Sequence, residues 1–274
     1  RDLRMSRGLG DVYKRQVLDV LRLQVETLGI DVFTEQNVNS IKKVSNGFKI
    51  SSDDNEKKYD FICNKLVIAN GSKAAPKLGG NASAIDYLKN FGHKVVSFSP
   101  ALCPVKVKSD VLKTLKGLRV TGKAQLYGEH GRLIKKETGE IQFTENSLSG
   151  ICVFNLSLFA KQNDKIVLDL LPDYSENELI KIIRQHMSLF SDLPCELLLT
   201  GIFQKRIGQA ILKISRVDLS KICSKLSKDE VSGICKTIKS MSFTVSGKED
   251  FSHAQCALGG VLGKEIDAVS YTHL

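Results

Sequence analysis

Apolar residues in the first part of the chain switch between helical and strand spacing, which is the pattern of an α/β layer. Residues from Val17 to Leu28 are apolar at helical intervals, and Gly29 follows as a C-cap residue. Asn46-Gly47 stands between two strand-like runs and predicts a hairpin. The extended segments expected here are residues 30–34, 38–44, 48–52 and 59–63.

A continuous apolar run of strand length, residues 65–69, ends at Asn70-Gly71. Such runs are typical of strands that are buried on both faces of a parallel sheet. We therefore expect residues 65–69 to form an interior strand. After a loop, the sequence Ser-Ala-Ile-Asp at residues 83–86 has the form of a capping box and predicts a helix that stops at Gly92.

The pattern changes at Pro100, where short extended segments joined by glycine-containing turns predict an antiparallel sheet or a small barrel. Helical spacing takes over after Pro172, with capping boxes at residues 175–178 and 227–230. Ser149 is expected to cap a further short apolar helix. The extended segments are residues 102–107, 118–127, 132–136, 140–144, 165–171 and 241–245.

Composition narrows the class of protein. The chain has 274 residues, 42% of them hydrophobic and 26% charged, which suits a folded protein of about two domains. Its seven cysteines show no metal-ligand spacing, which favours reduced, buried thiols in a cytoplasmic protein and no metal site. Neither a signal peptide nor an apolar run of membrane-spanning length is expected. The net charge of +10 leaves a nucleic-acid partner open, although no dense basic cluster supports it.

The best candidate for a ligand contact is the exit from residues 65–69, because ligands of open α/β sheets bind beyond the carboxyl ends of strands. Asn70 and Gly71 stand there, and a glycine lets a ligand approach the backbone. A plain strand-to-loop turn is the competing interpretation. Gly259-Gly260 also has two interpretations. Its backbone N–H groups could face a ligand, or the pair could form a tight hairpin turn.

The sequence does not identify a catalytic residue. Among the five histidines, His253 stands near the glycine pair and is the one that could face a site. A surface position is nevertheless the expected role of each histidine. No Ser/His/Asp order, HExxH motif or carboxylate pair stands out.

Five stretches of the sequence carry a family resemblance. They are LVIANGSKAAPKLGG, GHKVVSFSPAL, KETGEIQFTENSLSGICVFNLS, IVLDLLP and FSHAQCALGGVLGKEID. In order and spacing they resemble the bacterial NAD(P)/FAD-dependent oxidoreductases known as aminoacetone oxidase family FAD-binding enzymes. The resemblance covers Val17 to Asp267, and ETGEIQFT followed by LSG is among its more specific parts.

The resemblance implies an α/β fold in which a partial FAD/NAD(P)-binding Rossmann-like domain is interrupted by a small β-barrel and a helical subdomain. The family's G-x-G-x-x-G segment is not found, so we expect a fragment that binds FAD weakly or not at all. The ends resemble translated adapter sequence and are expected to be non-native. The implied ranges are 17–99 and 246–268 for the FAD-binding domain, 100–172 and 240–245 for the barrel, 173–239 for the helical subdomain, and 1–16 and 269–274 for the tails.

The same resemblance places seven residues at FAD. Asn70 departs from the family's usual threonine. Ala82 and Ala84 stand where the family commonly has glycines, and Ile85 stands where tyrosine is common. A loop with such a glycine replaced approaches a ligand less closely. The seven residues are Val38 on the adenine side, Ala69, Asn70 and Gly71 at the strand exit, and Gly259, Gly260 and Val261 near the flavin.

The function implied is transfer of hydride or electrons through FAD to or from a small-molecule substrate, with NAD(P)H as a further cofactor that stays open. Two alternatives remain at this point. One is a nucleic-acid-binding module that uses the basic surface and the barrel. The other is a degenerate homologue that keeps the fold without the chemistry. The sequence does not give the substrate or the oligomeric state.

Overall fold

The computed structural model describes residues 3–267, with side chains described from Arg15 onward. It falls into two compact units, Arg1–Val67 and Ile68–Leu274. Of the expected non-native tails, residues 1–2 and 269–274 lie outside the described residues. None of the described helices combines the length and the apolar content that a membrane span requires.

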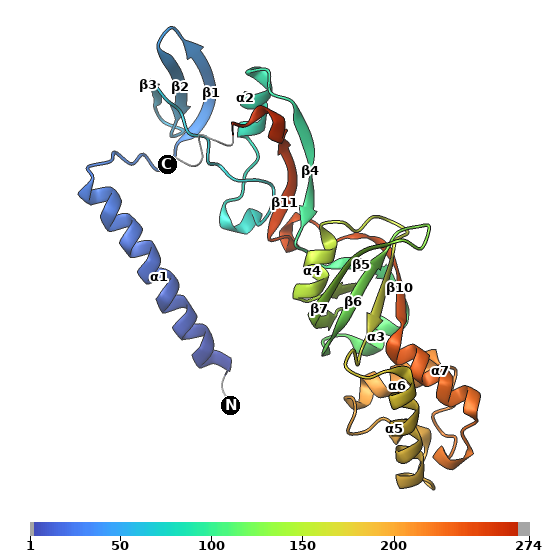
Figure 1. The fold of residues 1–274 in the computed structure, drawn as a ribbon. Helices are drawn as coiled ribbons and strands as arrows, with labels where there is room; N and C mark the ends of the chain where they lie inside the picture. The colour runs from blue at the N-terminus through green and yellow to red at the C-terminus, as the bar shows by residue number, and fades with distance from the viewer. Residues whose placement is uncertain (1–2, 268–274) are drawn as a thin grey trace. The chain divides into compact units, whose positions relative to one another are not determined.

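The first unit holds a helix and a small antiparallel sheet (Figure 1). The predicted hairpin is confirmed, because the two strands pair around Asn46-Gly47 with Val44 opposite Gly47. The helix begins earlier than predicted and includes most of the expected N-terminal tail, and Gly29 follows it with a left-handed φ of 62°. The elements are α1 (Leu3–Thr27), β1 (Asn37–Val44), β2 (Gly47–Asp53) and β3 (Lys58–Cys63).

Two predicted strands do not form. Residues 30–34 and residues 65–69 have no strand structure, and the Val67 side chain is 86% exposed. The prediction of a buried interior strand at 65–69 is therefore wrong for this structure. A strand needs neighbouring backbone to satisfy its N–H and C=O groups, and no described strand pairs with either segment.

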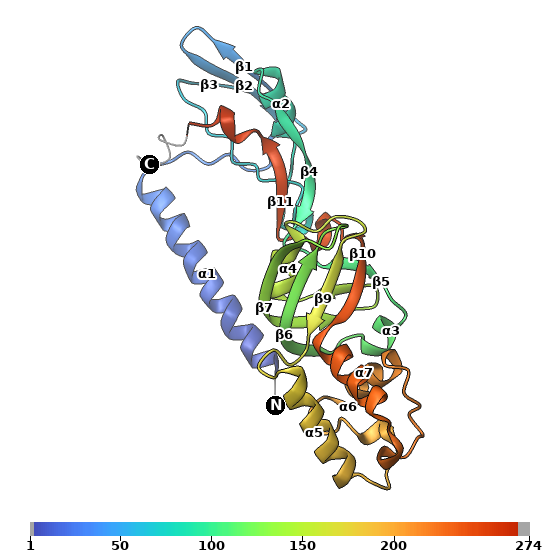
Figure 2. The same ribbon diagram turned by 45° about the vertical axis from the view of Figure 1, so that its right-hand side comes forward.

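The second unit is built around a closed barrel with the strand order β10-β5-β8-β7-β6-β9 (Figure 2). The predicted small barrel is thus confirmed. The segments predicted at 132–136 and 140–144 form one strand, because Gly139 continues the ladder opposite Gly122. The strands are β5 (Val105–Lys108), β6 (Arg119–Tyr127), β7 (Leu133–Phe143), β8 (Ser147–Ser149), β9 (Lys165–Asp169) and β10 (Met241–Lys248).

Three longer helices gather beyond one end of the barrel, and the described part of the second unit also contains three shorter helices (Figures 1 and 2). The longer ones are α5 (Glu176–Leu189), α6 (Lys205–Ile214) and α7 (Lys228–Lys239). The shorter ones are α2 (Ala84–Asn90), α3 (Val111–Leu115) and α4 (Ile151–Ser157). Single 3₁₀ turns are η1 (Pro76–Leu78), η2 (Cys195–Leu197), η3 (Cys223–Lys225), η4 (Phe251–His253) and η5 (Gly263–Glu265).

Helix caps were predicted with mixed success. The capping boxes headed by Ser175 and Ser227 are confirmed at α5 and α7. Ser83 makes no cap bond, because its backbone is already helical and its hydroxyl is not placed to accept from the first turn. Ser149 is the last residue of β8, so Gly150 takes the cap position of α4 without a side-chain bond.

One hydrophobic core runs through the barrel and the helices. Phe143 and Ile166 from the barrel strands and Ile211 and Ile234 from α6 and α7 are all fully buried in the same cluster. Burial of this kind contributes roughly 1.5–3 kcal/mol for each large apolar side chain. The barrel and the helices are therefore expected to fold as one body.

An antiparallel ribbon leaves the barrel at the end opposite the three helices (Figures 1 and 2). It consists of β4 (Val95–Ala101) and β11 (Cys256–Val261). Ala101 pairs with Cys256 at the barrel end, and Val95 pairs with Val261 at the far end. All pairs among the described strands are antiparallel, so the parallel sheet of the expected Rossmann-like domain is not among them.

Candidate functional site

The segment of residues 68–83, called the candidate loop below, contains an open backbone position. Gly71 has a left-handed φ of 83°, and a Cβ built on it would meet no atom within 4 Å. Beside it, Nδ2 of Asn70 donates a 2.5 Å hydrogen bond to the backbone oxygen of Asn81. This bond joins the two ends of the candidate loop. A ligand can therefore approach the backbone at Gly71 without displacing protein atoms.

Small side chains anchor the candidate loop to the segment that precedes β11. Ala74 is buried together with Cys103 and Ala254, in a cluster separate from the main core. The backbone N–H of Ala75 also donates to the oxygen of Phe251 over 3.2 Å. The path of the loop is thus fixed by η4 and by the end of the ribbon.

Two open pockets flank the candidate loop. One has a volume of about 730 Å³ and lies between the loop and Phe251, and Gly80 lines it. The other has a volume of about 310 Å³ and lies between Ala82 and the first residues of β4. Lys73 lines both pockets. These volumes fall within the range of small-molecule sites.

The glycine pair of β11 forms a β-bulge, so the hairpin-turn interpretation is wrong. The register against β4 shifts between Leu258 and Gly260, and the two glycines have φ values of 106° and 98°. A Cβ on Gly259 would lie 2.5 Å from the backbone oxygen of Ser97. The strand pairing itself therefore requires glycine at this position. Val261 continues the ladder beyond the bulge. Contact of these residues with a flavin stays a prediction.

The structure brings the candidate loop and the ribbon together through a short series of contacts. Asn70 bonds to Asn81, and the adjacent Ala82 lines the smaller pocket together with Phe98. The ring of Phe98 in turn lies 3.5 Å from the Cβ position of Gly260. The two predicted glycine regions thus border the same part of the second unit.

The remaining predicted cofactor residues are Val38 and Ala69. Val38 belongs to the first unit, pairs with Ser52 in the β1–β2 ladder and is 43% exposed. Ala69 is exposed at the start of the candidate loop. Neither residue is among those that line the pockets described above, so the cofactor contact of each stays a prediction.

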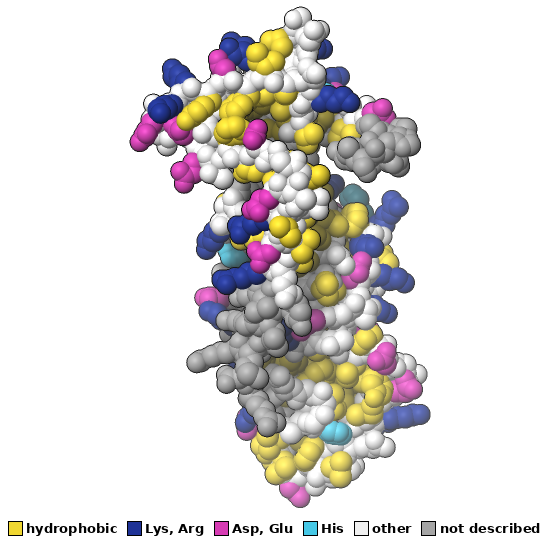
Figure 3. All heavy atoms as spheres, turned by 90° about the vertical axis from the view of Figure 1, so that its left-hand side faces the viewer, with side chains coloured by type: hydrophobic (Ala, Val, Ile, Leu, Met, Phe, Trp, Pro, Cys, Tyr) yellow, Lys and Arg dark blue, Asp and Glu magenta, His cyan; other side chains and the backbone are white. Residues whose placement is uncertain are grey.

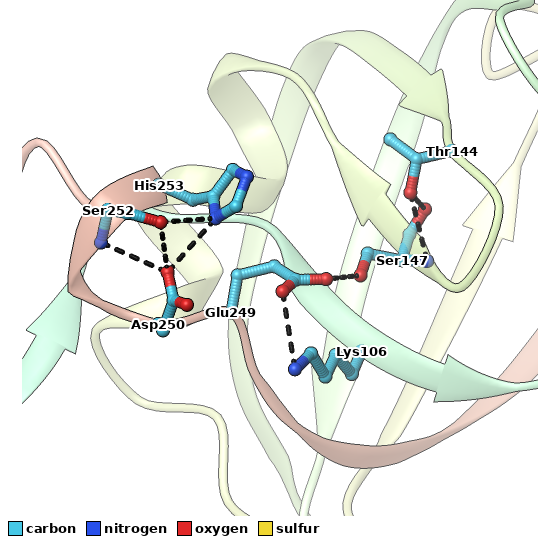
Figure 4. Close-up of polar contacts among 7 residues, drawn as sticks. All are labelled: Lys106, Thr144, Ser147, Glu249, Asp250, Ser252 and His253. Carbon is cyan, nitrogen blue, oxygen red and sulfur yellow. Dashed lines mark hydrogen bonds and ion pairs between the residues drawn. The ribbon is translucent and has the colours of Figure 1, made fainter.

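His253 is held in a surface turn (Figure 4). Its Nδ1 lies 3.0 Å from Oδ1 of Asp250 and 3.0 Å from Oγ of Ser252. Hydrogen bonds from Ser252 and His253 lower the pKa of the Asp250 carboxyl to about 2. Because one histidine nitrogen faces both partners, the three residues cannot relay a proton from serine through histidine to carboxylate. The cluster is a cap of η4.

A second network, drawn in the same view, fixes the seam of the barrel (Figure 4). Oε1 of Glu249 accepts a 2.6 Å hydrogen bond from Oγ of Ser147, and its Oε2 pairs with Nζ of Lys106 at 3.2 Å. Ser147 is 1% exposed. Glu249 therefore joins the end of β10 to β5 and β8, and it holds in place the strand that leads into α4.

Metal and thiol chemistry find little support in the described residues. No group of three or more His, Cys, Asp or Glu side chains there is arranged to hold a metal ion. All seven cysteines are free thiols. Burial raises the pKa of both Cys152 and Cys235 to about 11, so these thiols are poor nucleophiles near neutral pH.

Two residues that line a pocket, Lys73 and Phe251, were not predicted from the sequence. Each belongs to one of the stretches that carry the family resemblance. That membership was the available signal, but only the fold shows that the two residues line the same pocket. Lys73 supplies an exposed positive charge beside the open backbone of Gly71.

Comparisons with known proteins agree on one family. A family model described as "HI0933-like protein barrel and H2TH domain" matches residues 99–256, more than half of the chain. A 3-dehydro-bile acid delta(4,6)-reductase of Clostridium scindens is 28% identical over 95% of this chain and 65% of its own length. Ribosomal RNA dihydrouridine synthases of Haemophilus influenzae and Escherichia coli are each 23% identical, over 92% and 93% of this chain. The chain spans 61% to 65% of the length of these relatives.

Proposed function

Since the chain belongs to the HI0933-like family of FAD-dependent oxidoreductases, we propose that its protein is a flavin-dependent reductase of carbon–carbon double bonds conjugated to a carbonyl group. The names of two kinds of relative support this reaction, because a delta(4,6)-reductase and a dihydrouridine synthase both add hydrogen across such a bond. Steroid and pyrimidine rings otherwise share little chemistry.

The open, left-handed backbone at Gly71 is the observation that best supports cofactor binding in the second unit. FAD would supply the hydride chemistry, and NAD(P)H is the proposed electron donor. The candidate loop would present its backbone to the cofactor, and Lys73 would place a positive charge beside it. The proposed contacts are Val38, Ala69, Asn70, Gly71, Gly259, Gly260 and Val261, within a Rossmann-like arrangement whose parallel sheet is also a proposal.

The proposal is tested on protein expressed from the complete open reading frame that encodes this chain. We expect the purified protein to take up FAD, and NADH or NADPH to bleach the visible flavin band under anaerobic conditions. Protein that stays colourless after incubation with FAD and gel filtration would instead support the degenerate homologue. A cytoplasmic location also stays a prediction.

RNA is a second candidate partner, favoured by the net charge of +10 and by the two relatives named for ribosomal RNA. On the face drawn in Figure 3, however, acidic and basic side chains are interspersed. A filter-binding titration with ribosomal RNA at low and high salt tests this partner, because phosphate contacts weaken steeply as salt rises. Absence of binding at low salt would exclude it.

A further inference from the structure

A third pocket, called the α4 pocket below, lies where the barrel meets the ribbon and has a volume of about 360 Å³. In Figures 1 and 2, α4 stands at the barrel end from which the ribbon leaves. The pocket draws on β7, on the turn after β8, on α4, and on the crossing where the N–H of Gln255 donates to the oxygen of Leu102 over 3.2 Å. Three of the five stretches that carry the family resemblance therefore meet at it.

Strand register explains why side chains point into the α4 pocket. Gln142 of β7 lies opposite Ser149 of β8, and residues opposite each other in an antiparallel pair share one face. The adjacent pair, Phe143 and Leu148, is fully buried in the core, so Gln142 and Ser149 face the other way. Gly150 then turns the chain into α4 with a φ of 98°.

The turn at Gly150 is built by a close approach of two backbones. A Cβ on Gly150 would lie 2.3 Å from the backbone oxygen of Glu140. The same oxygen accepts a 3.1 Å hydrogen bond from Sγ of Cys152. These contacts fix the backbone at the edge of the pocket where α4 begins.

Ser149 carries a hydroxyl group that the protein itself does not use. The residue is 7% exposed, and its Oγ has no hydrogen-bond partner among the described residues. No fully buried side-chain oxygen or nitrogen in the described part of the chain lacks a partner. The Ser149 oxygen must therefore keep its small accessible surface, and the α4 pocket is the space that it lines. A hydroxyl in this position is available to a ligand.

The exposed side of α4 supplies an apolar wall. Cys152, Val153 and Leu156 point into the core and are buried. Ile151, by contrast, is 67% exposed, and Phe154 is half-buried, and both line the pocket. Neither side chain belongs to the main core cluster. They leave apolar surface that a ligand could cover.

The charges and amides of the α4 pocket favour an uncharged ligand. Its one charged residue, Glu140, is already paired with NH1 of Arg119 at 3.1 Å. Side-chain amides come from Gln142 and Gln255, and from Asn155, whose Nδ2 already donates to Oε2 of Glu137 over 3.3 Å. An amide can donate to a carbonyl oxygen and also accept a hydrogen bond. The pocket thus combines an apolar wall with neutral donors and acceptors, as small-molecule sites commonly do.

We propose that the α4 pocket binds an uncharged, largely apolar ring compound through a carbonyl group. Apolar rings would lie on Ile151 and Phe154, and the carbonyl oxygen would accept from the Ser149 hydroxyl or from an amide. This inference rests on the proposed function in one respect, because it identifies the bound compound as the conjugated ketone to be reduced. Binding itself requires no flavin.

The test measures binding of progesterone, a ring ketone conjugated to a double bond, to the purified chain without flavin by equilibrium dialysis. Ile151→Glu puts an uncompensated charge on the apolar wall and should weaken binding at least about tenfold. Leu189→Glu is the matched control, because Leu189 of α5 is 75% exposed and does not line the pocket. Circular dichroism and thermal unfolding confirm that both variants fold.

A second variant, Gln255→Leu, keeps the size of the side chain and removes its amide. We expect it to weaken progesterone more than it weakens a steroid hydrocarbon that lacks the carbonyl. Uridine serves as the polar comparison and should bind more weakly than progesterone. Equal binding of progesterone by wild-type, Ile151→Glu and Leu189→Glu chains, or no binding by the wild-type chain, would overturn the proposal.

The outcome is distinguishable from failure of the proposed function. If the chain binds progesterone in an Ile151-dependent way but the complete protein takes up no flavin, the reductase proposal fails and the pocket proposal stands. If the complete protein binds flavin and reduces uridine, and Ile151→Glu has no effect, the pocket proposal fails and the reductase proposal stands.

Discussion

Replacing Gly150 by alanine should be unusually costly, because two separate penalties act at one residue. Its φ of 98° is a conformation that L-residues rarely adopt, which costs about 1–3 kcal/mol. The new Cβ would also lie 2.3 Å from the Glu140 oxygen, and forcing that wall apart adds about 1–3 kcal/mol. The expected loss is therefore about 2–6 kcal/mol in the free energy of unfolding.

Gly117→Ala is the matched control for this prediction. Gly117 has a φ of 84°, but its Cβ position has no atom within 4 Å, so only the conformational cost of about 1–2 kcal/mol applies. Thermal unfolding followed by circular dichroism compares the two variants. With about 2–4 °C per kcal/mol for a domain of this size, Gly150→Ala should melt several degrees below Gly117→Ala. Equal melting temperatures would refute the close approach at Gly150.

Three further outcomes test particular residues. Ser175→Ala should cost about 1 kcal/mol through loss of its cap, while Ser83→Ala, which removes no cap bond, should leave thermal stability unchanged. The pKa of Asp250 is lowered to about 2, so its stabilising contribution is complete above the ordinary value near 3.8 and is lost as pH falls toward 2. In acid unfolding, Asp250→Asn should therefore lose less stability over this pH range than the wild-type chain does. In native chain, a thiol reagent should label Cys63 and Cys256 first, because the other five cysteines are buried; early labelling of the buried thiols, followed by mass spectrometry, would contradict the core.

Local signals in the sequence correctly predicted the hairpin and two of the three capping boxes, and the box at Ser83 is the exception. The Asn46-Gly47 hairpin and the capping boxes at Ser175 and Ser227 depend on a few adjacent residues, and all three formed as predicted. The barrel followed from strand spacing and glycine-containing turns. Its closure could not be derived from spacing, because the pairing of β10 with β5 joins residues that are far apart in the chain.

Predictions failed where the structure depends on partners distant in sequence. Residues 65–69 are apolar enough for an interior strand, but no described strand offers them backbone partners. Gly259 was judged as a ligand contact or a turn, whereas the backbone of Ser97 in the opposite strand sets its conformation. No sequence pattern predicts that the backbone of the partner strand lies so close to Gly259.

The candidate sites also differ in how far the sequence could predict them. The strand exit and the family resemblance both selected Asn70 and Gly71. The backbone at Gly71 is open, and contact of these residues with a cofactor stays a prediction. The α4 pocket was not anticipated, because Ser149 and Gln142 meet only through the β7–β8 register. Gln255 comes from more than a hundred residues further along the chain.

A single-turnover reaction tests the central claim most directly. The complete protein is loaded with FAD, reduced with dithionite without oxygen, and mixed with progesterone or uridine. The account predicts that the visible flavin band returns and that one saturated product molecule forms for each flavin reoxidised. A flavin that stays reduced with every conjugated carbonyl compound, yet is reoxidised at once by oxygen, would contradict it.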